Sequence, residues 1–524
     1  MPASVRLIRK HQALRASRWS HPAIAIPCLL LSLAAGADSR TPAEPEPPRE
    51  EQGTRESPAL PPGLEPASQA SKTPEPASTD SGPPLPSGLG SSSAPSSAPP
   101  LPSGLSEQAA QPRPLEGSTK AADIAGPLSG FIEIRGGMRL QSDPNQESLS
   151  LGETRLQLSR DQYFGEAMLR LTADFVYDDV ADSHRIRLEP GQGWLDLREA
   201  FVSAPLGERL DVRMGRQVLT WGVGDLLFLN DLFPKDWNAF FVGRDVDYLK
   251  APSDAVRLAL FGELFNVDLV YTPRFDADRY LDPRRLSFYD PRIGAVAGRN
   301  VEFDPQLPNE WFEDDEWALR LHRLLGGWEL AAYGYRGFWK SPEGFDAASG
   351  RPIFSKLAAW GGSIRGPLHT GILSAETSWY RSRDDLDGTD PFVPNSQFRF
   401  LVGYEQEVVP DLMLGAQYYL ERILDFGALK RNQPAGFPFP DENRHLFTLR
   451  LTLLTHAQNV TWSLFSFASP SDRDAYLRGL WSWKATDAWT VSAGFNLFEG
   501  RDNSSFFGQF ERNSNAYLGL RYGF

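Results

Sequence analysis

The strongest constraint on the fold is a series of strand-length segments in which apolar and polar side chains alternate. In the segment 164–177, Leu171 and Phe175 share one face, whereas Arg170 and Asp174 share the other. A period of two residues predicts strands whose two faces meet different surroundings. We predict about eighteen strands, with about sixteen as the alternative. Their expected ranges are 130–140, 150–160, 164–177, 194–204, 208–220, 253–261, 264–273, 315–325, 327–339, 355–365, 370–381, 396–407, 410–424, 444–455, 458–468, 473–484, 487–499 and 514–524.

The connections between these segments alternate between short and long. The short ones are predicted at 160–163, 205–208, 261–264, 325–327, 366–369, 409–411, 456–459 and 486–487. The long ones are predicted at 178–193, 221–252, 274–314, 340–354, 382–395, 425–443 and 500–513, with compact members at 141–149 and 469–472. Tight turns on one rim, long loops on the other and an even strand number are typical of bacterial outer-membrane barrels. We therefore predict an all-β fold, a transmembrane antiparallel β-barrel over residues 128–524, in the outer membrane.

The two faces of the predicted strands indicate lipid outside and water inside. In the closing segment 514–524, Leu518 and Tyr522 lie on one side and Tyr517 and Arg521 on the other. A charge on the lipid face would cost about 2–4 kcal/mol at the bilayer midplane, so ionised groups should point inward. Backbone groups in lipid must find partners, which requires the sheet to close. A closed sheet of this size encloses an aqueous passage unless a further element fills it.

The N-terminus is predicted to be a secretory signal peptide, residues 1–37. Basic residues precede an apolar run at 23–35, which ends in the small residues Ala35-Gly36-Ala37. No other run approaches the roughly 20 apolar residues that a membrane-spanning helix needs. The single cysteine, Cys28, lies inside the apolar run, so the sequence predicts no disulfide in the mature chain. A lipoprotein is disfavoured because Leu29 and further apolar residues follow the cysteine.

Residues 38–127 form a Pro-, Ser-, Ala- and Gly-rich segment that is predicted to be disordered and periplasmic. The motif Pro-Pro-Leu-Pro-Ser-Gly-Leu occurs at 83–89 and again at 99–105. Such a composition favours an extended, solvated chain that cannot build a core. Two interpretations stay open: a spacer without a specific role, and an arm that binds the cell wall or a periplasmic complex.

Arginine is unusually frequent at the positions predicted to point into the barrel. Guanidinium groups pair well with carboxylates and phosphates, so such a lining would favour anionic solutes. Carboxylates such as Glu133, Asp174 and Glu376 are also predicted to point inward. A mixed, ion-paired wall around a water-filled lumen is therefore the alternative. The candidate pore-lining residues are Arg135, Arg139, Arg155, Arg170, Arg213, Arg257, Arg320, Arg399, Arg450 and Arg478.

The predicted loop 221–252 is unusually apolar for a segment expected outside the cell. It contains Leu226-Leu-Phe-Leu229 and Phe240-Phe-Val242. Because so much apolar surface should not be exposed to water, we predict that the loop folds into the barrel as a constriction. The alternative is a loop packed on its neighbours above the rim. The charged residues expected at the constriction are Asp225, Asp231, Lys235, Asp236, Arg244 and Asp245.

A resemblance to known families lies between residues 197 and 234. The motifs are Leu197-Arg-Glu-Ala-Phe-Val202, Met214-Gly-Arg-Gln217, Trp221-Gly222 and Asn230-Asp-Leu-Phe-Pro234. This stretch resembles the porin-like and alginate-export-like outer-membrane barrel families. The resemblance implies a transport function, and an arginine-rich lumen of the kind that conducts a polyanionic sugar chain. The long Pro-rich segment departs from the pattern of those families.

The sequence predicts no enzyme, cofactor or metal site. Neither His-Glu-x-x-His nor Gly-x-Ser-x-Gly occurs, and the histidines after the signal are scattered along the chain. The acidic clusters at 178–182, 313–316 and 384–390 lack the full spacing of a calcium loop, and we expect them to aid solubility or to meet lipopolysaccharide through divalent cations. The net charge of −14 argues against nucleic acid as a partner.

The leading functional hypothesis is an outer-membrane channel, either a porin or an export conduit. It would pass small hydrophilic, anionic solutes or an anionic polysaccharide such as alginate. The alternative is an outer-membrane scaffold or anchor whose Pro-rich arm engages the cell wall or a periplasmic complex. The expected partners are outer-membrane lipid and lipopolysaccharide, together with the barrel assembly machinery that inserts such proteins.

Overall fold

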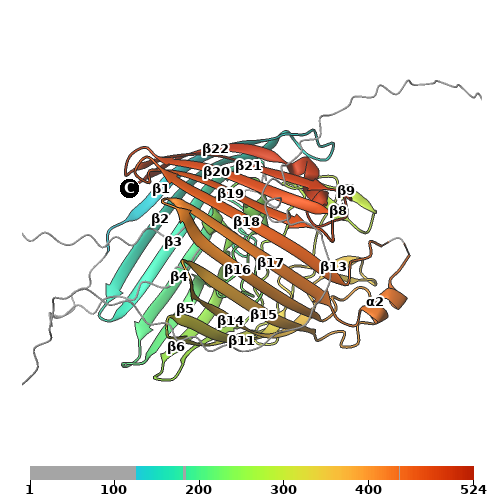
Figure 1. Cartoon of the computed structure of the whole chain (residues 1–524), viewed down its shortest axis with the longest axis horizontal. Coiled ribbons are helices and arrows are strands. Elements are labelled where there is room, and N and C mark those ends of the chain that lie inside the picture. Colours follow the sequence, from blue (N-terminus) through green and yellow to red (C-terminus); the bar gives the residue numbers. More distant parts are fainter. Residues whose placement is uncertain (1–125, 181–184, 436) are drawn as a thin grey trace, which may run out of the picture. The chain divides into compact units, whose positions relative to one another are not determined.

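The computed structural model describes residues 126–180, 185–435 and 437–524. The predicted signal peptide 1–37 and the Pro-rich segment up to residue 125 lie outside the described residues. Eighteen strands form one sheet, and β1 pairs with β22 to close it, which confirms the predicted antiparallel barrel (Figure 1). Since a closed barrel with an apolar exterior is a membrane-spanning structure of bacterial outer membranes, the fold also supports the predicted location.

The strands of the barrel lie close to the ranges predicted from the alternation. They are β1 (Ser129–Arg139), β2 (Leu149–Phe164), β3 (Ala167–Asp178), β4 (Leu195–Pro205), β5 (Leu210–Val218), β6 (Pro252–Phe261), β7 (Asn266–Thr272), β10 (Glu316–Leu325), β11 (Trp328–Phe338), β14 (Lys356–Leu368), β15 (Gly371–Ser382), β16 (Gln397–Val409), β17 (Leu412–Ile423), β18 (Asn443–Thr455), β19 (Val460–Ser469), β20 (Asp474–Lys484), β21 (Trp489–Gly500) and β22 (Asn515–Gly523).

The long loops contain short elements that the sequence pattern did not predict. Two small hairpins form separate sheets, one of β8 with β9 and one of β12 with β13. The helical elements are single turns or little more. Their bounds are β8 (Phe288–Asp290), β9 (Ala295–Ala297), β12 (Gly344–Asp346), β13 (Arg351–Ile353), α1 (Trp237–Val242), η1 (Val246–Leu249), α2 (Phe426–Asn432) and η2 (Gly508–Asn513). In the described parts of the chain, no helix has the length and apolar character of a membrane span.

The short connection between β10 and β11 uses two glycines, which tolerate a left-handed backbone. Between β10 and β11, Leu325 faces Trp328 in register, and the two residues between them are Gly326 (φ 58°) and Gly327 (φ 86°). Two positive φ values in a two-residue turn match the twist of the strands that it joins. Ser129 of β1 and Gly523 of β22 lie on this same rim, because the strand number is even. The long-loop rim is therefore the extracellular one.

The outer face of the sheet is apolar, as predicted from the alternation. Leu171 and Phe175 of β3 are 46% and 38% exposed, whereas Asp174 between them is fully buried. Leu518 of β22 is 67% exposed, and its neighbour Tyr517 points inward and is buried. Exposed apolar side chains alternating with buried polar ones are expected when the outside of a barrel meets hydrocarbon.

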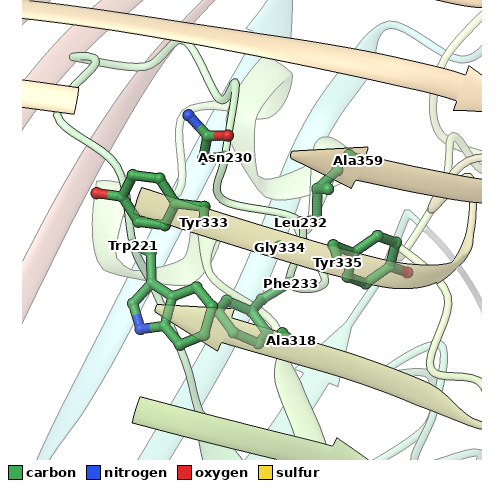
Figure 2. A pocket seen from close by; sticks show the side chains of 9 residues that line it. All are labelled: Trp221, Asn230, Leu232, Phe233, Ala318, Tyr333, Gly334, Tyr335 and Ala359. Atoms are coloured by element: carbon green, nitrogen blue, oxygen red, sulfur yellow. The ribbon is translucent and has the colours of Figure 1, made fainter. Parts of the chain in front are cut away.

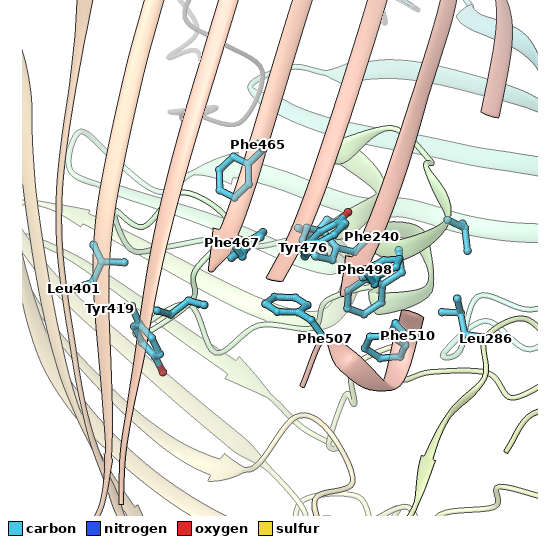
Figure 3. Close-up of a cluster of buried hydrophobic side chains, with 14 of the residues drawn as sticks. Phe240, Leu286, Leu401, Tyr419, Phe465, Phe467, Tyr476, Phe498, Phe507 and Phe510 are labelled. Carbon is cyan, nitrogen blue, oxygen red and sulfur yellow. The ribbon is translucent and has the colours of Figure 1, made fainter. Parts of the chain in front are cut away.

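The inner face is less uniformly polar than the sequence analysis assumed. Along β19–β22, large aromatic side chains point inward and are buried, among them Phe467, Tyr476 and Phe498 (Figure 3). Their rings stack closely, with 4.6 Å between the centroids of Tyr476 and Phe498. Because both faces of these strands carry apolar residues, the alternation could not reveal that this part of the wall is dry.

A charge on the outer face of β18 should destabilise the barrel. Leu449 is 37% exposed in the middle of the strand, so Leu449→Arg should lower the free energy of unfolding by about 2–4 kcal/mol if it lies near the bilayer midplane. The measurement is urea unfolding of the protein in phospholipid vesicles. The control is Ser463→Arg, at an inward position of the adjacent β19, which should cost much less. Equal losses for both variants would contradict the assignment of faces.

Candidate functional site: the inserted segment

The segment 219–251, which connects β5 to β6, lies inside the barrel and is named the inserted segment below. It contains α1 and η1. The Asp236 side chain caps α1 by accepting a 2.8 Å hydrogen bond from the backbone N–H of Ala239, and Gly243 ends the helix at φ 87°. Four consecutive residues of the helix, 239–242, are buried, so the apolar run predicted to avoid water does so here.

The first part of the inserted segment is bound to β15, β17 and β18. The buried Glu376 carboxylate accepts hydrogen bonds from the backbone N–H groups of Val223 (2.8 Å) and Asn230 (2.9 Å) and from the Asn230 side-chain amide (2.8 Å). Arg450 binds Asp225 through two nitrogens, at 2.5 and 2.7 Å. Because inward side chains supply these partners, this part of the segment follows the inner wall.

The helix α1 packs on the aromatic wall of β19–β22. The Phe240 ring lies 5.6 Å from that of Tyr476, and the Phe241 ring lies 5.6 Å from that of Phe498 (Figure 3). Gly243 follows the helix at a very close approach: a Cβ there would lie 2.2 Å from the ring of Tyr517. Only glycine fits this position, both for the positive φ and for the contact.

The last part of the inserted segment is bound to β1–β4 by charged groups. Arg244 pairs with Glu153 at 2.7 Å, and the Tyr248 hydroxyl donates to Asp174 at 2.9 Å. Arg198 donates to the backbone carbonyl of Lys250 at 2.7 Å. Strands β1–β4 lie across the barrel from β15–β18 in the strand order, so this part lies against the opposite side of the wall from residues 223–230.

Aromatic packing holds the start of the inserted segment against β10 and β11. Trp221 meets Phe233 edge to face at 4.8 Å and lies 6.2 Å from Tyr333 (Figure 2). A small, nearly filled cavity lies among these rings. The inserted segment thus touches inward side chains from β1 to β22, which places it across the interior and not above the rim.

A second layer from the loop between β7 and β10 covers the inserted segment. The buried Asp278 accepts hydrogen bonds from the backbone N–H of Lys235 and from the Trp237 indole, both at 2.8 Å. Arg279 pairs with Asp196 of β4 at 2.6 Å. Burial raises the pKa of Asp278. The sequence analysis did not single out these residues, since only their contacts, and not their spacing, identify them.

Most of the predicted pore-lining arginines form ion pairs. Seven of the ten have a carboxylate partner, which favours the mixed, ion-paired wall over an arginine lining without partners. The pairs are Arg135 with Glu133, Arg155 with Glu153 and Asp174, Arg170 with Asp161, Arg257 with Asp268, Arg320 with Glu329, Arg399 with Glu421 and Arg450 with Asp225.

The other three arginines differ from one another. Arg139 donates to backbone carbonyls, including that of Leu149 at 2.7 Å, and Arg478 donates to the carbonyl of Arg244 at 3.2 Å. Both side chains are buried, as are Arg135 and Arg155, so these four hold loops in place and are not exposed to lumen water. Arg213 lies 4.5 Å from the centre of the Phe201 ring and has no ion-pair partner among the described residues.

The charged residues predicted at the constriction all lie in the inserted segment, but several are buried in its own contacts. Lys235 pairs with Asp231 at 3.0 Å, and both are buried. Asp236 caps α1 and Arg244 binds the wall. Asp225 and Asp245 stay partly exposed, with side-chain exposures of 22% and 30% in their pairs with Arg450 and Arg521.

An open recess remains between the inserted segment and the wall formed by β14–β18. About 550 Å³ of space between atoms lies here, part of it open solvent, and Asp225 contributes to the recess from the inserted segment. Two adjacent ion pairs line it, Arg450 with Asp225 and Arg365 with Glu405 at 3.0 Å. Arg365 and Glu405 were not in the predicted site set. In the described residues, no group of His, Cys, Asp and Glu is arranged to hold a metal ion.

The stability of the covering loop should depend on the ionisation of Asp276. Burial, with the neighbouring Asp254 carboxylate, raises the pKa of Asp276 to about 6. The folded chain therefore binds this proton more tightly than the unfolded chain, and the contribution of Asp276 to stability falls as the pH rises from about 4 to about 6. Asp276→Asn should gain stability relative to the wild type across that range, measured by urea unfolding. Asp304→Asn, in the same loop but exposed, is the control; a pH-independent difference for Asp276→Asn would contradict the expectation.

Comparison with solved structures finds barrels of bacterial outer membranes. OccAB4 of Acinetobacter baumannii has a TM-score of 0.47 and 8% sequence identity, covering 76% of this chain and 97% of that one. OccK11 (OpdR) of Pseudomonas aeruginosa has a TM-score of 0.45 and 11% identity, covering 76% and 95%. The outer membrane channel DcaP of A. baumannii has a TM-score of 0.37 and 11% identity, covering 78% and 99%. No protein-family description and no curated protein matches the chain, and similarities at this level do not assign it to a family.

Proposed function

We propose that the chain forms a channel for small hydrophilic solutes across the outer membrane. The observation that carries the proposal is the open recess beside Asp225 and Arg450, where polar side chains stay exposed after the inserted segment has filled much of the interior. A closed sheet of eighteen strands is wider than its own side chains can fill. The inserted segment then narrows the passage without contributing a catalytic group.

We further propose a preference for small anions over a polysaccharide such as alginate. Arg213 lies opposite Arg257 in register, and only Arg257 has a carboxylate partner, Asp268. Arg213 therefore makes no direct ion pair with a described neighbour, and in a narrow passage such a charge attracts anions. The inserted segment argues against a polymer, because its contacts with β1, β15 and β20 leave little room for a thick chain to thread.

Loosening the inserted segment should change the conductance. Glu376→Ala removes the acceptor of three hydrogen bonds to the segment, each worth about 1–3 kcal/mol to a charged group. Single-channel recordings in planar bilayers should show a larger or more frequently fluctuating conductance than the wild type. The matched control is Glu329→Ala on β11, whose ion pair with Arg320 does not involve the segment. Identical traces for Glu376→Ala and the wild type would contradict the proposed role of the segment.

Removing the charge of Arg213, which makes no ion pair with a described neighbour, should reduce the anion preference. In a salt gradient, Arg213→Ala should shift the reversal potential toward cation selectivity, whereas Arg213→Lys should retain the wild-type value because the charge remains. Arg450→Ala is a less direct test, since it also frees the Asp225 carboxylate. An unchanged reversal potential for Arg213→Ala would remove the anion preference and leave the channel itself intact.

The scaffold hypothesis makes a different prediction for the same recordings. A barrel that serves only to anchor the Pro-rich arm would be silent in planar bilayers, both in the wild type and in Glu376→Ala. The arm itself lies outside the described residues. Silence in correctly folded protein, judged by heat-modifiable migration on gels, would therefore replace the channel proposal with the scaffold.

A further inference from the structure

We propose that the outer face of β11, β14 and β15, at the extracellular rim, binds the phosphate groups of an outer-leaflet glycolipid of the lipopolysaccharide type. Four cationic side chains lie there: Arg336, Lys356, Arg381 and Arg383. Ala358 of β14 lies between Arg336 and Arg381 in register, so these two arginines flank one small residue across three adjacent strands. The strands β11, β14 and β15 lie side by side in the barrel wall (Figure 1). This site is separate from the lumen, and the inference depends on the barrel but not on conduction.

The direction of the cationic side chains follows from their neighbours. Tyr335 and Tyr380, which precede Arg336 and Arg381, point into the barrel, and Tyr380 is 1% exposed. Successive residues of a strand point to opposite faces, so both arginines point outward. Both are exposed, as is Lys356. The cluster thus lies where the apolar outer surface ends and the long loops begin.

The side chains of the cluster lack ion-pair partners among the described residues. None of its four members forms an ion pair within the described parts of the chain. The Asp384 carboxylate accepts a 2.6 Å hydrogen bond from the backbone N–H of Lys356 and not from its side chain. By contrast, Arg422 on the outer face of β17 pairs with Glu442 at 3.0 Å. A concentration of unpaired cations at a membrane rim attracts anionic lipid headgroups.

The surface next to the cluster suits the apolar part of a lipid. Trp360 and Trp379 lie directly opposite each other, two pairs closer to the bilayer than Ala358 and Arg381, and are 48% and 42% exposed. Gly334 lies opposite Trp360, and a Cβ on Gly334 would meet nothing within 4 Å. The outer surface at Gly334 is therefore bare backbone with open space beside the Trp360 indole, and this place is called the notch below. Tryptophan at this depth is typical of the membrane interface.

Cations above an aromatic pair and a notch favour a phosphorylated lipid over free phosphate. Guanidinium groups bind phosphate oxygens through charge-assisted hydrogen bonds. Free phosphate would use only these groups and would be indifferent to Gly334. A glycolipid would place its phosphates on the arginines and an acyl chain along the notch. The two ligands therefore differ in their response to a change at Gly334.

The test is the affinity of the full-length folded protein, in detergent, for bisphosphorylated lipid A. The double variant Arg336→Ala/Arg381→Ala should bind about fivefold more weakly for each arginine removed, the factor expected for one basic side chain near an anionic headgroup. Arg422→Ala is the matched control, because it removes an outward arginine that already has a partner. Dephosphorylated lipid A should bind the wild type no more tightly than bisphosphorylated lipid A binds the double variant.

The second variant, Gly334→Leu, fills the notch and should weaken lipid A binding without changing the cationic cluster. Inorganic phosphate is the probe for the other ligand, and millimolar phosphate should not displace lipid A. Displacement by phosphate, or wild-type affinity in the double variant, would overturn the proposal. Heat-modifiable migration verifies folding, and conductance is recorded on the same preparations. A channel that conducts normally but binds no lipid A would refute this inference while leaving the channel function intact.

Discussion

Closure of the sheet between β1 and β22 is the constraint on which the rest of the structure depends. Backbone N–H and C=O groups have no partners in hydrocarbon, so an open edge in the membrane would be prohibitively costly. Closure satisfies them, as in the pairing of Ile132 with Tyr522. It also fixes the circumference at eighteen strands, and a sheet of this size leaves an interior that its own side chains cannot fill. The inserted segment fills much of that interior space.

The inserted segment is held by polar contacts on one part of the wall and by aromatic contacts on another. On β15–β18 and β1–β4 the contacts are polar, with Glu376 and Glu153 binding the segment. On β19–β22 they are aromatic, with Phe240 against Tyr476. A buried charge is tolerated only when it is paired and hydrogen-bonded. This requirement explains why the buried arginines are paired and do not line water, as with Arg155 and its two carboxylate partners on β2 and β3.

The alternation of side chains was sufficient to predict the eighteen strands, because burial and lipid exposure act on single residues at a period of two. The apolar content of 221–252 was likewise sufficient to predict insertion. Contacts between residues distant in the chain were not predictable. Nothing in the sequence links Asp278 to Lys235, or Phe498 to Phe241, and the inward direction of Phe498 is hidden because aromatic residues occupy both faces of β21.

Counting inward arginines was a weak guide to selectivity, because a charge affects a passing solute only to the extent that its neighbours leave it uncompensated. Arg257 and Arg213 lie opposite each other on adjacent strands, yet one is paired with Asp268 and the other packs on Phe201 without an ion pair to a described residue. The same criterion applies outside the barrel, where Arg422 is paired with Glu442 and Arg381 is not. Pairing is a property of the folded arrangement. The cations that are free to bind an external anion can therefore be identified only once register and loop contacts are known.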